Sequence, residues 1–470
     1  MNGRAVLHLA PLAAGLCAVL GSTSACAASG TALSIAAKGV GGLLQVSSLG
    51  AITHLVTNCA DDPTPGSQSL RDIVSAPSTQ DGDTVDLSPL LLQSCSKVTL
   101  TNGEITVNQA SLTIQGPSSG AVTVAGDPNC TTKPHCRVFS HQGSGTLTIT
   151  DLTIADGVYF DVQSSYGGCI RSAGSIYLNH ATVTGCTATI TGSNGNSRSS
   201  GGGLFAQTGV QLLFSTVSGN NVSGGASLGG GIYDHYGQFI AKYSAIENNT
   251  SGGSAGGIYA YAGSSSSVIL SSTIAGNTAD DYGGGRIFGS NQVLIANSTI
   301  SRNSVTFDVG GLALWGPATF LIANSTVTEN HANRYGGGGI YAAASLSIIS
   351  SIIANNTASG EVANQDLKLR QGVGLPPPTG SNNLIISSQD VAQLTSTIAQ
   401  DPKLSPLQLN GGRTRTHALL SGSPAIGTGN NSANLATDQR GKGYPRTTNG
   451  MADIGAFQFD SIFADGLEDF

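Results

Sequence analysis

Charged and aromatic residues are both scarce in this chain. Only 10% of its 470 residues are charged, and 20 Lys and Arg stand against 27 Asp and Glu, a net charge of −7. A surface that binds nucleic acid needs clustered cations. Between Gly168 and Asn356 the cations are few and scattered. No nucleic-acid partner is therefore expected.

Long apolar runs and helical spacing are also rare. After the first 27 residues no stretch is apolar and long enough to cross a bilayer as a helix, so the mature chain is expected to lack a transmembrane helix. One short amphipathic helix is predicted over residues 65–75, because Leu70, Ile73 and Val74 have helical spacing. Pro77 follows as a stop.

Glycine, in contrast, is abundant, and it recurs in doublets about 27 residues apart. The last glycines of these doublets are Gly168, Gly203, Gly231, Gly257, Gly285, Gly311 and Gly339. About fifteen residues after most doublets comes a β-branched residue with Asn three positions later. These Asn residues are Asn220, Asn249, Asn277, Asn303, Asn330 and Asn356. Two residue patterns that recur with the same period and a constant offset indicate stacked repeats that share one core.

The repeating unit has strand chemistry. Runs such as residues 268–274 and 320–327 are rich in β-branched residues, alternate in polarity and are bounded by turn residues. About 27 residues hold three short strands and three turns, and stacking puts each strand beside its successor at ~4.8 Å. The predicted fold is all-β, a parallel β-helix of about ten coils with a short N-terminal helical cap.

The repeated residues have structural explanations. Asn side chains at equivalent positions can donate amide to carbonyl up the stack and tolerate left-handed turns. The glycines are expected at another corner, where a Cβ would clash or be strained. We therefore interpret both sets as structural, with the Asn residues forming a ladder.

The first residues are typical of an export signal. Arg4 precedes an apolar run over residues 5–20, and the small residues 25–27 form a cleavage site. We predict a signal peptide over residues 1–27. Cys26 leaves a lipoprotein signal open as an alternative. Thr23 argues against it, because an aliphatic residue is expected at that position of a lipoprotein signal.

Six cysteines remain after the signal. An even number in an exported chain favours disulfides, and their spacings contain no Cys-x-x-Cys zinc or redox pattern. Cys130 and Cys136 flank a short loop, and Cys169 and Cys186 lie in the Gly and Asn phases of one coil. The predicted disulfides are Cys59–Cys95, Cys130–Cys136 and Cys169–Cys186.

The pattern divides the chain into successive segments. After the signal peptide we expect a weakly ordered lead over 28–55 and an N-terminal cap over 56–97, which would cover the open end of the sheet. The β-helix follows over 98–375. A run of prolines at 376–378 precedes a different pattern over 381–459, and a tail occupies 460–470.

The segment from Asp401 to Phe459 carries a series of short motifs in order. They read Asp-Pro-x-Leu, Asn-Gly-Gly, Thr-x-Ala-Leu, Gly-Ser-Pro-Ala-Ile, Asp-Gln-Arg-Gly and Asp-Ile-Gly-Ala-Phe. The series resembles the choice-of-anchor Q domain of bacterial surface and secreted proteins. The Gly-Gly-aliphatic and Ile-x-x-Asn marks resemble polymorphic outer membrane protein repeats, although that family usually has Phe where this chain has Ile or Val. These resemblances imply a right-handed parallel β-helix at the cell surface or in the medium of a Gram-negative bacterium, and they imply no reaction.

Carboxylates of the turn that precedes each Gly doublet are the catalytic candidates. Asp280, Asp281 and Asp308, with Arg334, follow their ladder Asn residues closely and would lie along one edge of the solenoid. Converging carboxylates serve acid–base chemistry or hold Ca²⁺. The alternative is that they are solvated turn residues. No resident cofactor is expected, with Ca²⁺ as the only candidate ion.

A partial aromatic stripe is the binding candidate. Phe205, Tyr233, Tyr259 and Tyr341 each stand two residues after a Gly doublet, while Phe288 is displaced by one position and Ala313 interrupts the set. Outward rings would stack on sugars, or on one another without any ligand. Asp234 and His235 are expected to be surface neighbours on one strand.

Two functions follow from these patterns. The first is a non-catalytic, adhesin-like protein, secreted or on the cell surface, that presents a polar face to a polysaccharide or cell-surface glycan. The second is a polysaccharide lyase or glycoside hydrolase that uses the carboxylates of the turn.

Overall fold

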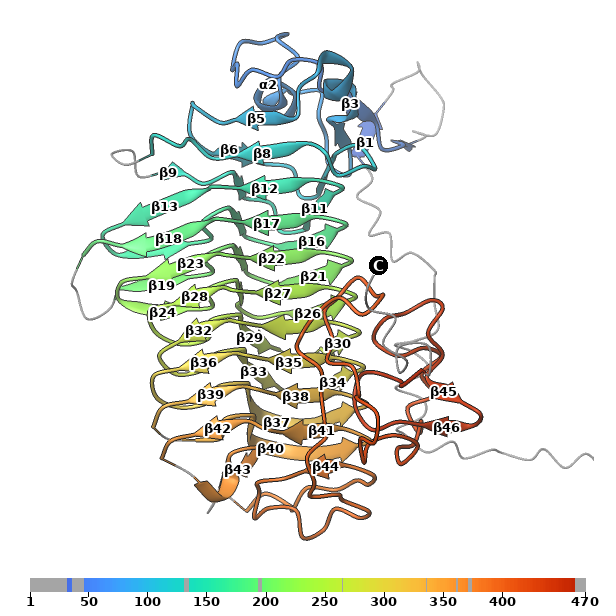
Figure 1. The fold of residues 1–470 in the computed structure, drawn as a ribbon. Coiled ribbons are helices and arrows are strands. Elements are labelled where there is room, and N and C mark those ends of the chain that lie inside the picture. Colours follow the sequence, from blue (N-terminus) through green and yellow to red (C-terminus); the bar gives the residue numbers. More distant parts are fainter. Residues whose placement is uncertain are drawn as a thin grey trace, which may run out of the picture.

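In a computed structural model the chain folds as a parallel β-helix of about eleven coils (Figure 1). The model describes residues 32–35, 46–130, 135–192, 197–263, 265–334, 336–360, 362–370 and 374–460. The predicted signal peptide and the tail from residue 461 lie outside these ranges. The prediction of an all-β solenoid is confirmed.

Each coil contributes two neighbouring strands to the largest sheet, sheet 1. The first column contains β6 (Ile105–Val107), β10 (Phe139–His141), β15 (Ile170–Ser172), β20 (Leu204–Ala206), β25 (Ile232–Asp234), β29 (Ile258–Ala262), β33 (Gly285–Gly289) and β43 (Leu367–Leu369). The second column contains β3 (Thr53–Leu55), β4 (Thr84–Asp86), β7 (Leu112–Gln115), β11 (Thr146–Thr150), β16 (Ser175–Asn179), β21 (Gly209–Leu213), β26 (Gln238–Lys242), β30 (Ser267–Leu270) and β34 (Gln292–Ala296). Two longer strands, β37 (Leu312–Ala323) and β40 (Ile340–Ile349), span both columns.

Two further sheets close the coil. Sheet 2 contains β5 (Lys97–Thr99), β8 (Thr123–Ala125), β12 (Thr153–Ala155), β17 (Thr182–Thr184), β22 (Thr216–Ser218), β27 (Ala245–Glu247), β31 (Thr273–Ala275), β35 (Thr299–Ser301), β38 (Thr326–Thr328), β41 (Ile352–Ala354) and β44 (Leu384–Ile385). Sheet 3 contains β9 (His135–Cys136), β13 (Val158–Asp161), β18 (Thr187–Ile190), β23 (Asn221–Ser223), β28 (Thr250–Ser251), β32 (Thr278–Ala279), β36 (Ser304–Val305), β39 (His331–Ala332) and β42 (Thr357–Ala358). Strands pair in parallel with their successors, except that β9 is antiparallel to β13.

The remaining elements are short. A small sheet 4 contains β14 (Ser164–Tyr166), β19 (Arg198–Ser200) and β24 (Ala226–Leu228). Two antiparallel hairpins are formed by β1 (Ala32–Ile35) with β2 (Val46–Leu49) and by β45 (Thr447–Thr448) with β46 (Met451–Ala452). The helical elements are α2 (Leu70–Ser75) and the 3₁₀ turns η1 (Ser88–Gln93) and η2 (Val362–Asn364).

Helix α2 is shorter than predicted. It begins at Leu70, because the preceding residues Gly66 and Gln68 have φ angles of 82° and 57°, outside the helical region. Ser69 caps its N-terminus by accepting a hydrogen bond from the backbone N–H of Asp72. Leu70 and Val74 are buried against the first coils.

A row of buried Asn side chains runs through six coils. Each Nδ2 donates to the Oδ1 of the next coil at 2.8–3.0 Å, and also to a backbone carbonyl of the coil before. Each Oδ1 from Asn249 onward also accepts the backbone N–H of the preceding ladder residue. The row ends on Asp366, which accepts from Asn356 at 2.9 Å. The predicted ladder is thus present.

The left-handed turn lies one residue away from where the sequence placed it. Its positive φ angles belong to the residues that precede the ladder Asn residues, which are Gly219, Asn248, Gly276, Arg302, Glu329 and Asn355. The Asn residues of the ladder are free to use their side chains between coils. The corrected picture separates the turn-forming residue from the hydrogen-bonding one.

The Gly doublets exist because backbones stack closely. A Cβ on Gly202 would lie 2.2 Å from the carbonyl oxygen of Gly230, and one on Gly203 would lie 2.8 Å from that of Gly231. A side chain at these positions would push each coil away from its neighbour.

The structure contains three disulfides. They join Cys59 to Cys95, Cys130 to Cys136 and Cys169 to Cys186, the same pairs as predicted.

Residues 401–460 lie along the outer face of sheet 2, beside β31 to β41 (Figure 1). Thr299 donates to Gln439 Oε1 at 2.6 Å, and Ser301 Oγ lies 2.8 Å from His417 Nε2. Within the segment, Arg440 pairs with buried Asp438 at 2.7 Å. Motif residues of this segment therefore attach it to the solenoid.

Asp234 corrects the expectation of a surface position. It follows inward-facing Ile232 by two residues on β25, and its side chain is fully buried in register with Ala206 and Ala260. Burial raises the pKa of Asp234 to about 7, although nearby backbone amides of Gly237 and Tyr236 oppose the rise. The carboxyl is thus neutral in mildly acidic solution.

We expect Asn303→Ala to destabilise the solenoid by about 3 kcal/mol, because it leaves buried groups of Asn277 and Ile274 without partners. The half-exposed Asn221→Ala serves as control and should cost less than about 0.5 kcal/mol. Denaturant unfolding measures both. Equal effects would contradict a stabilising ladder.

Asp234 should also make stability fall as pH rises. Its folded-state pKa lies above the unfolded value of about 3.9, so the folded state holds the extra proton between about pH 4 and 7. Relative to Asp234→Asn, the wild-type protein should lose a few kcal/mol across that window and stay level above it. Unfolding curves of both proteins at pH 4 to 8 test this, and parallel pH profiles would contradict it.

Candidate functional site

The turn between sheet 3 and sheet 1 brings two of the candidate carboxylates together. Tyr282 and Val309 form a parallel bridge between adjacent coils. Asp281 and Asp308 directly precede these residues, so they occupy equivalent positions one strand spacing apart, ~4.8 Å. The expected stacking of carboxylates along one edge therefore holds for this pair.

The two carboxyls have different surroundings. Asp281 Oδ2 accepts a hydrogen bond from Ser254 Oγ at 2.9 Å. Burial raises the pKa of Asp308, the charge of Asp281 raises it further, and Lys368 opposes the rise. One carboxyl is thus hydrogen-bonded while its neighbour has an increased preference for the protonated form.

The other two catalytic candidates point elsewhere. Asp280 precedes Asp281, and its carbonyl accepts the backbone N–H of Phe307, whose own carbonyl accepts that of Arg334. These bonds join the turns of three successive coils. The Arg334 guanidinium lies 5.2 Å from the ring centre of Phe307. Asp280 is in register with Thr306 and belongs to the row next to the Asp281–Asp308 pair.

Strand pairing also changes the predicted aromatic stripe. The position after Tyr259 is occupied by Arg286, then by Ala313 and Tyr341. Phe288 belongs to a second row, where it stacks on Tyr261 with ring centres 4.5 Å apart. The stripe is thus continuous only over the earlier coils.

In those coils the rings cover one another. Phe205 and Tyr233 stack with their centres 5.4 Å apart, and each is only 7% exposed. Tyr233 stacks in turn on Tyr259 at 5.3 Å. Rings with both faces covered cannot stack on a ligand, so Phe205 and Tyr233 act as a structural ladder. Tyr259 and Tyr341 remain half-buried.

Arg286 ends the aromatic ladder and begins a mixed cluster. Its guanidinium lies 5.5 Å from the ring centre of Tyr259, donates to that hydroxyl at 3.0 Å, and lies 5.1 Å from the ring of Trp315. Arg370, which directly follows the last strand of the first column, lies 5.2 Å from the ring centre of Trp315. The indole is thereby held between two guanidinium groups.

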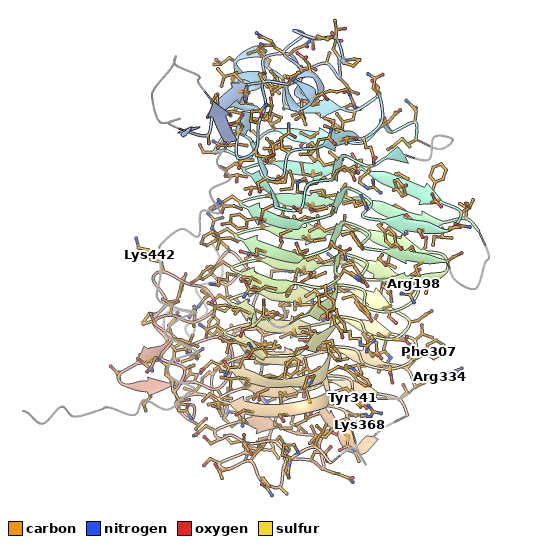
Figure 2. All side chains as sticks on the ribbon, turned by 180° about the vertical axis from the view of Figure 1, so that it is seen from behind. Arg198, Phe307, Arg334, Tyr341, Lys368 and Lys442 are labelled. Atoms are coloured by element: carbon orange, nitrogen blue, oxygen red, sulfur yellow. A yellow bond between two sulfur atoms is a disulfide. The ribbon has the colours of Figure 1, made fainter. Side chains whose placement is uncertain are left out.

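The cluster also contains Tyr341 and Lys368. Tyr341 lies against Trp315 with ring centres 5.8 Å apart. Burial raises the pKa of the Tyr341 hydroxyl, the charge of Arg370 opposes the rise, and Asp308 adds to it. Figure 2 shows Phe307, Arg334, Tyr341 and Lys368 along this one edge of the solenoid. We call Asp281, Asp308, Arg286, Trp315, Tyr341, Lys368 and Arg370 the edge cluster.

Two donors of the cluster are buried without a hydrogen-bond partner. They are Nε of Arg286 and Nε1 of Trp315. Buried donors normally have partners. A shallow hollow of about 300 Å³ adjoins the cluster at Arg370 and continues along residues 375–378.

Sequence reasoning did not identify Arg286, Trp315, Lys368 and Arg370. One signal was available, because Trp315 is the only Trp of the chain and stands two residues after Ala313 on an outward face. Within the described ranges no three His, Cys, Asp or Glu side chains gather to hold a metal ion, and no helix there is long and apolar enough to cross a membrane.

Comparisons with known proteins do not assign the chain to a family. No protein-family model and no curated protein matches the chain. Among solved structures, the crystal structure of pectate lyase Pel9A is similar with a TM-score of 0.45 at 14% identity, over 87% of this chain and 96% of that one. The resemblance to choice-of-anchor Q domains and outer membrane protein repeats therefore stays a prediction.

Proposed function

We propose that this protein is exported and binds a polysaccharide or cell-surface glycan at the edge cluster, in an adhesin-like role and without cleaving it. The observation that supports this most is the arrangement of Arg286, Trp315 and Arg370, in which two guanidinium groups flank one indole. Stacking on Trp315 holds both guanidinium groups in place, and Nη1 of Arg286 also donates to the Tyr259 hydroxyl.

The rest of the cluster has the composition that sugar recognition requires. Lys368 and Tyr341 add donors, Asp281 and Asp308 add acceptors, and the rings give an apolar base. Ligand sites typically combine aromatic surface with a few converging polar groups. A ligand oxygen would reach the unpartnered donors of Arg286 and Trp315 only if the side chains that cover them shifted on binding.

Export is supported by the signal-like first residues and by the disulfides. Three disulfides join all six cysteines that follow residue 27. Such bonds persist in oxidising compartments. These observations support the proposal that the protein is secreted or lies on the cell surface of a Gram-negative bacterium.

Trp315→Ala should weaken binding about tenfold or more, because it removes the support of both guanidinium groups. A glycan array identifies the ligand, and titration calorimetry then measures the affinity of each variant. Tyr177→Ala is the matched control, since Tyr177 is a half-buried ring on the second column of sheet 1 in an earlier coil. Equal affinities of the wild-type and Trp315→Ala proteins would refute binding at this cluster.

A second function, glycoside hydrolysis, is favoured by the Asp281–Asp308 pair. A retaining hydrolase holds its two carboxyls about 5–5.5 Å apart, one protonated as acid and one ionised as nucleophile. The strand spacing of ~4.8 Å and the raised pKa of Asp308 suit these roles. Asp308 would then be the acid and Asp281 the nucleophile.

Release of reducing ends from a polysaccharide panel tests hydrolysis. If it occurs, Asp308→Asn should lower the rate at least a hundredfold, and Asp280→Asn, in the neighbouring row, should leave it unchanged. The rate should fall as pH rises through the raised pKa of Asp308, because the acid must carry its proton. Retention of glycan with no reducing ends released would exclude this second function.

A further inference from the structure

The outer face of sheet 3 presents two columns of polar side chains. Seven successive strands, β18 to β42, place one residue of each coil in the first column. Its members are Thr187, Asn221, Thr250, Thr278, Ser304, His331 and Thr357. The second column, two residues later in each coil, contains Thr189, Ser223, Gly252, Asp280, Thr306, Asn333 and Ser359. We call these residues the hydroxyl face.

The residues between the two columns point inward and are small. Ala279, Val305, Ala332 and Ala358 form a buried cluster under the face. Their alternation with the outer residues fixes which side chains face solvent. Neighbouring residues within a column are therefore ~4.8 Å apart, and the two columns are about 7 Å apart along the strand.

Side chains of the face hold one another in place. Thr250 and Thr278 hydroxyls lie 3.1 Å apart, and Thr189 lies 3.0 Å from Ser223. His331 bridges the columns, with its ring nitrogens 2.7 Å from Thr357 Oγ1 and from Asn333 Oδ1. Donors and acceptors thus stand at set positions, which lowers the entropy cost of binding a ligand.

The face is almost uncharged. Asp280 is the only formally charged residue among its fourteen positions, and the nearby cation Arg334 lies beyond the second column. Anionic polysaccharide or nucleic acid would find no cations here, and a membrane would find no apolar surface. The C-terminal segment lies on the other side of the solenoid and leaves the face open (Figure 1).

We infer that the hydroxyl face binds a neutral, insoluble polysaccharide whose extended chains lie across the coils. A repeating array of hydroxyl, amide and imidazole groups matches the repeating hydroxyls of such chains. Regular rows of hydroxyls could also bind ice, but an ice lattice requires the same group in every coil. Here Asn221, Gly252, Asp280 and His331 interrupt the rows of hydroxyls. This inference is independent of the edge cluster.

Retention of the full chain on particulate cellulose, chitin and β-1,3-glucan tests the inference. The wild-type protein should bind at least one of them, and a triple Thr→Lys variant at Thr250, Thr278 and Thr306 should bind about tenfold more weakly. The control is the same triple substitution at Thr123, Thr153 and Thr182, which lie in register on sheet 2. The control should bind as the wild type does, so a loss confined to the first variant assigns retention to the hydroxyl face.

Thermal unfolding checks that each variant is folded. If the Lys variant unfolds, Thr→Val at the same three positions removes the hydroxyls at nearly constant volume and should also reduce retention. Retention of the Thr→Val variant at the wild-type level would overturn the inference. So would a wild-type protein that binds only acidic polysaccharide, or that adsorbs to ice and to none of the three particles.

Discussion

The row of buried Asn amides is the interaction on which the rest of the fold depends. Each amide satisfies its neighbours above and below, so a coil that slipped by one residue would leave several buried polar groups without partners. The row therefore fixes the register of the strands in the six coils through which it runs. Once the register is fixed, a residue type that recurs at the same position of successive coils forms a column on the solenoid. Stacked rings, paired carboxylates and rows of hydroxyls are three results of the same constraint.

This constraint also explains what the sequence could and could not predict. The roles of Gly and Asn were recognisable because stacked coils require the same residue at the same position. The Asp281–Asp308 pair could be predicted because both residues follow their ladder Asn at similar spacing. Arg286 was missed because it takes the place of an aromatic residue, and Arg370 because it follows the last regular repeat. Asp234 was misplaced because polarity predicts exposure, whereas strand alternation directed it inward. Which turn residue adopts the left-handed conformation depends on backbone geometry that residue types alone do not determine.

The C-terminal segment covers one face of the solenoid and leaves another exposed. Its Gln439 and His417 bond to Thr299 and Ser301, and it thereby covers the outer hydroxyl groups of sheet 2 in the later coils. Sheet 3 bears similar hydroxyls with no such cover. The motif Asp438-Gln-Arg440 thus has a structural role, with its ion pair buried and its Gln spanning to the solenoid. The face of sheet 3 and the edge beside it are consequently left uncovered by this segment.

Binding is a better account of that edge than cleavage because of where the cations lie. A catalytic acid needs its pKa raised, and at Asp308 burial and the charge of Asp281 raise the pKa while Lys368 opposes part of the rise. Arg286 and Arg370 are held by the indole of Trp315, which suits donors that must keep one position while a ligand remains bound. In the proposed binding, the ammonium group of Lys368 and the two guanidinium groups would hold the hydroxyl or carboxyl oxygens of a sugar. The geometry of the edge cluster therefore supports the proposal of glycan retention more than the proposal of hydrolysis.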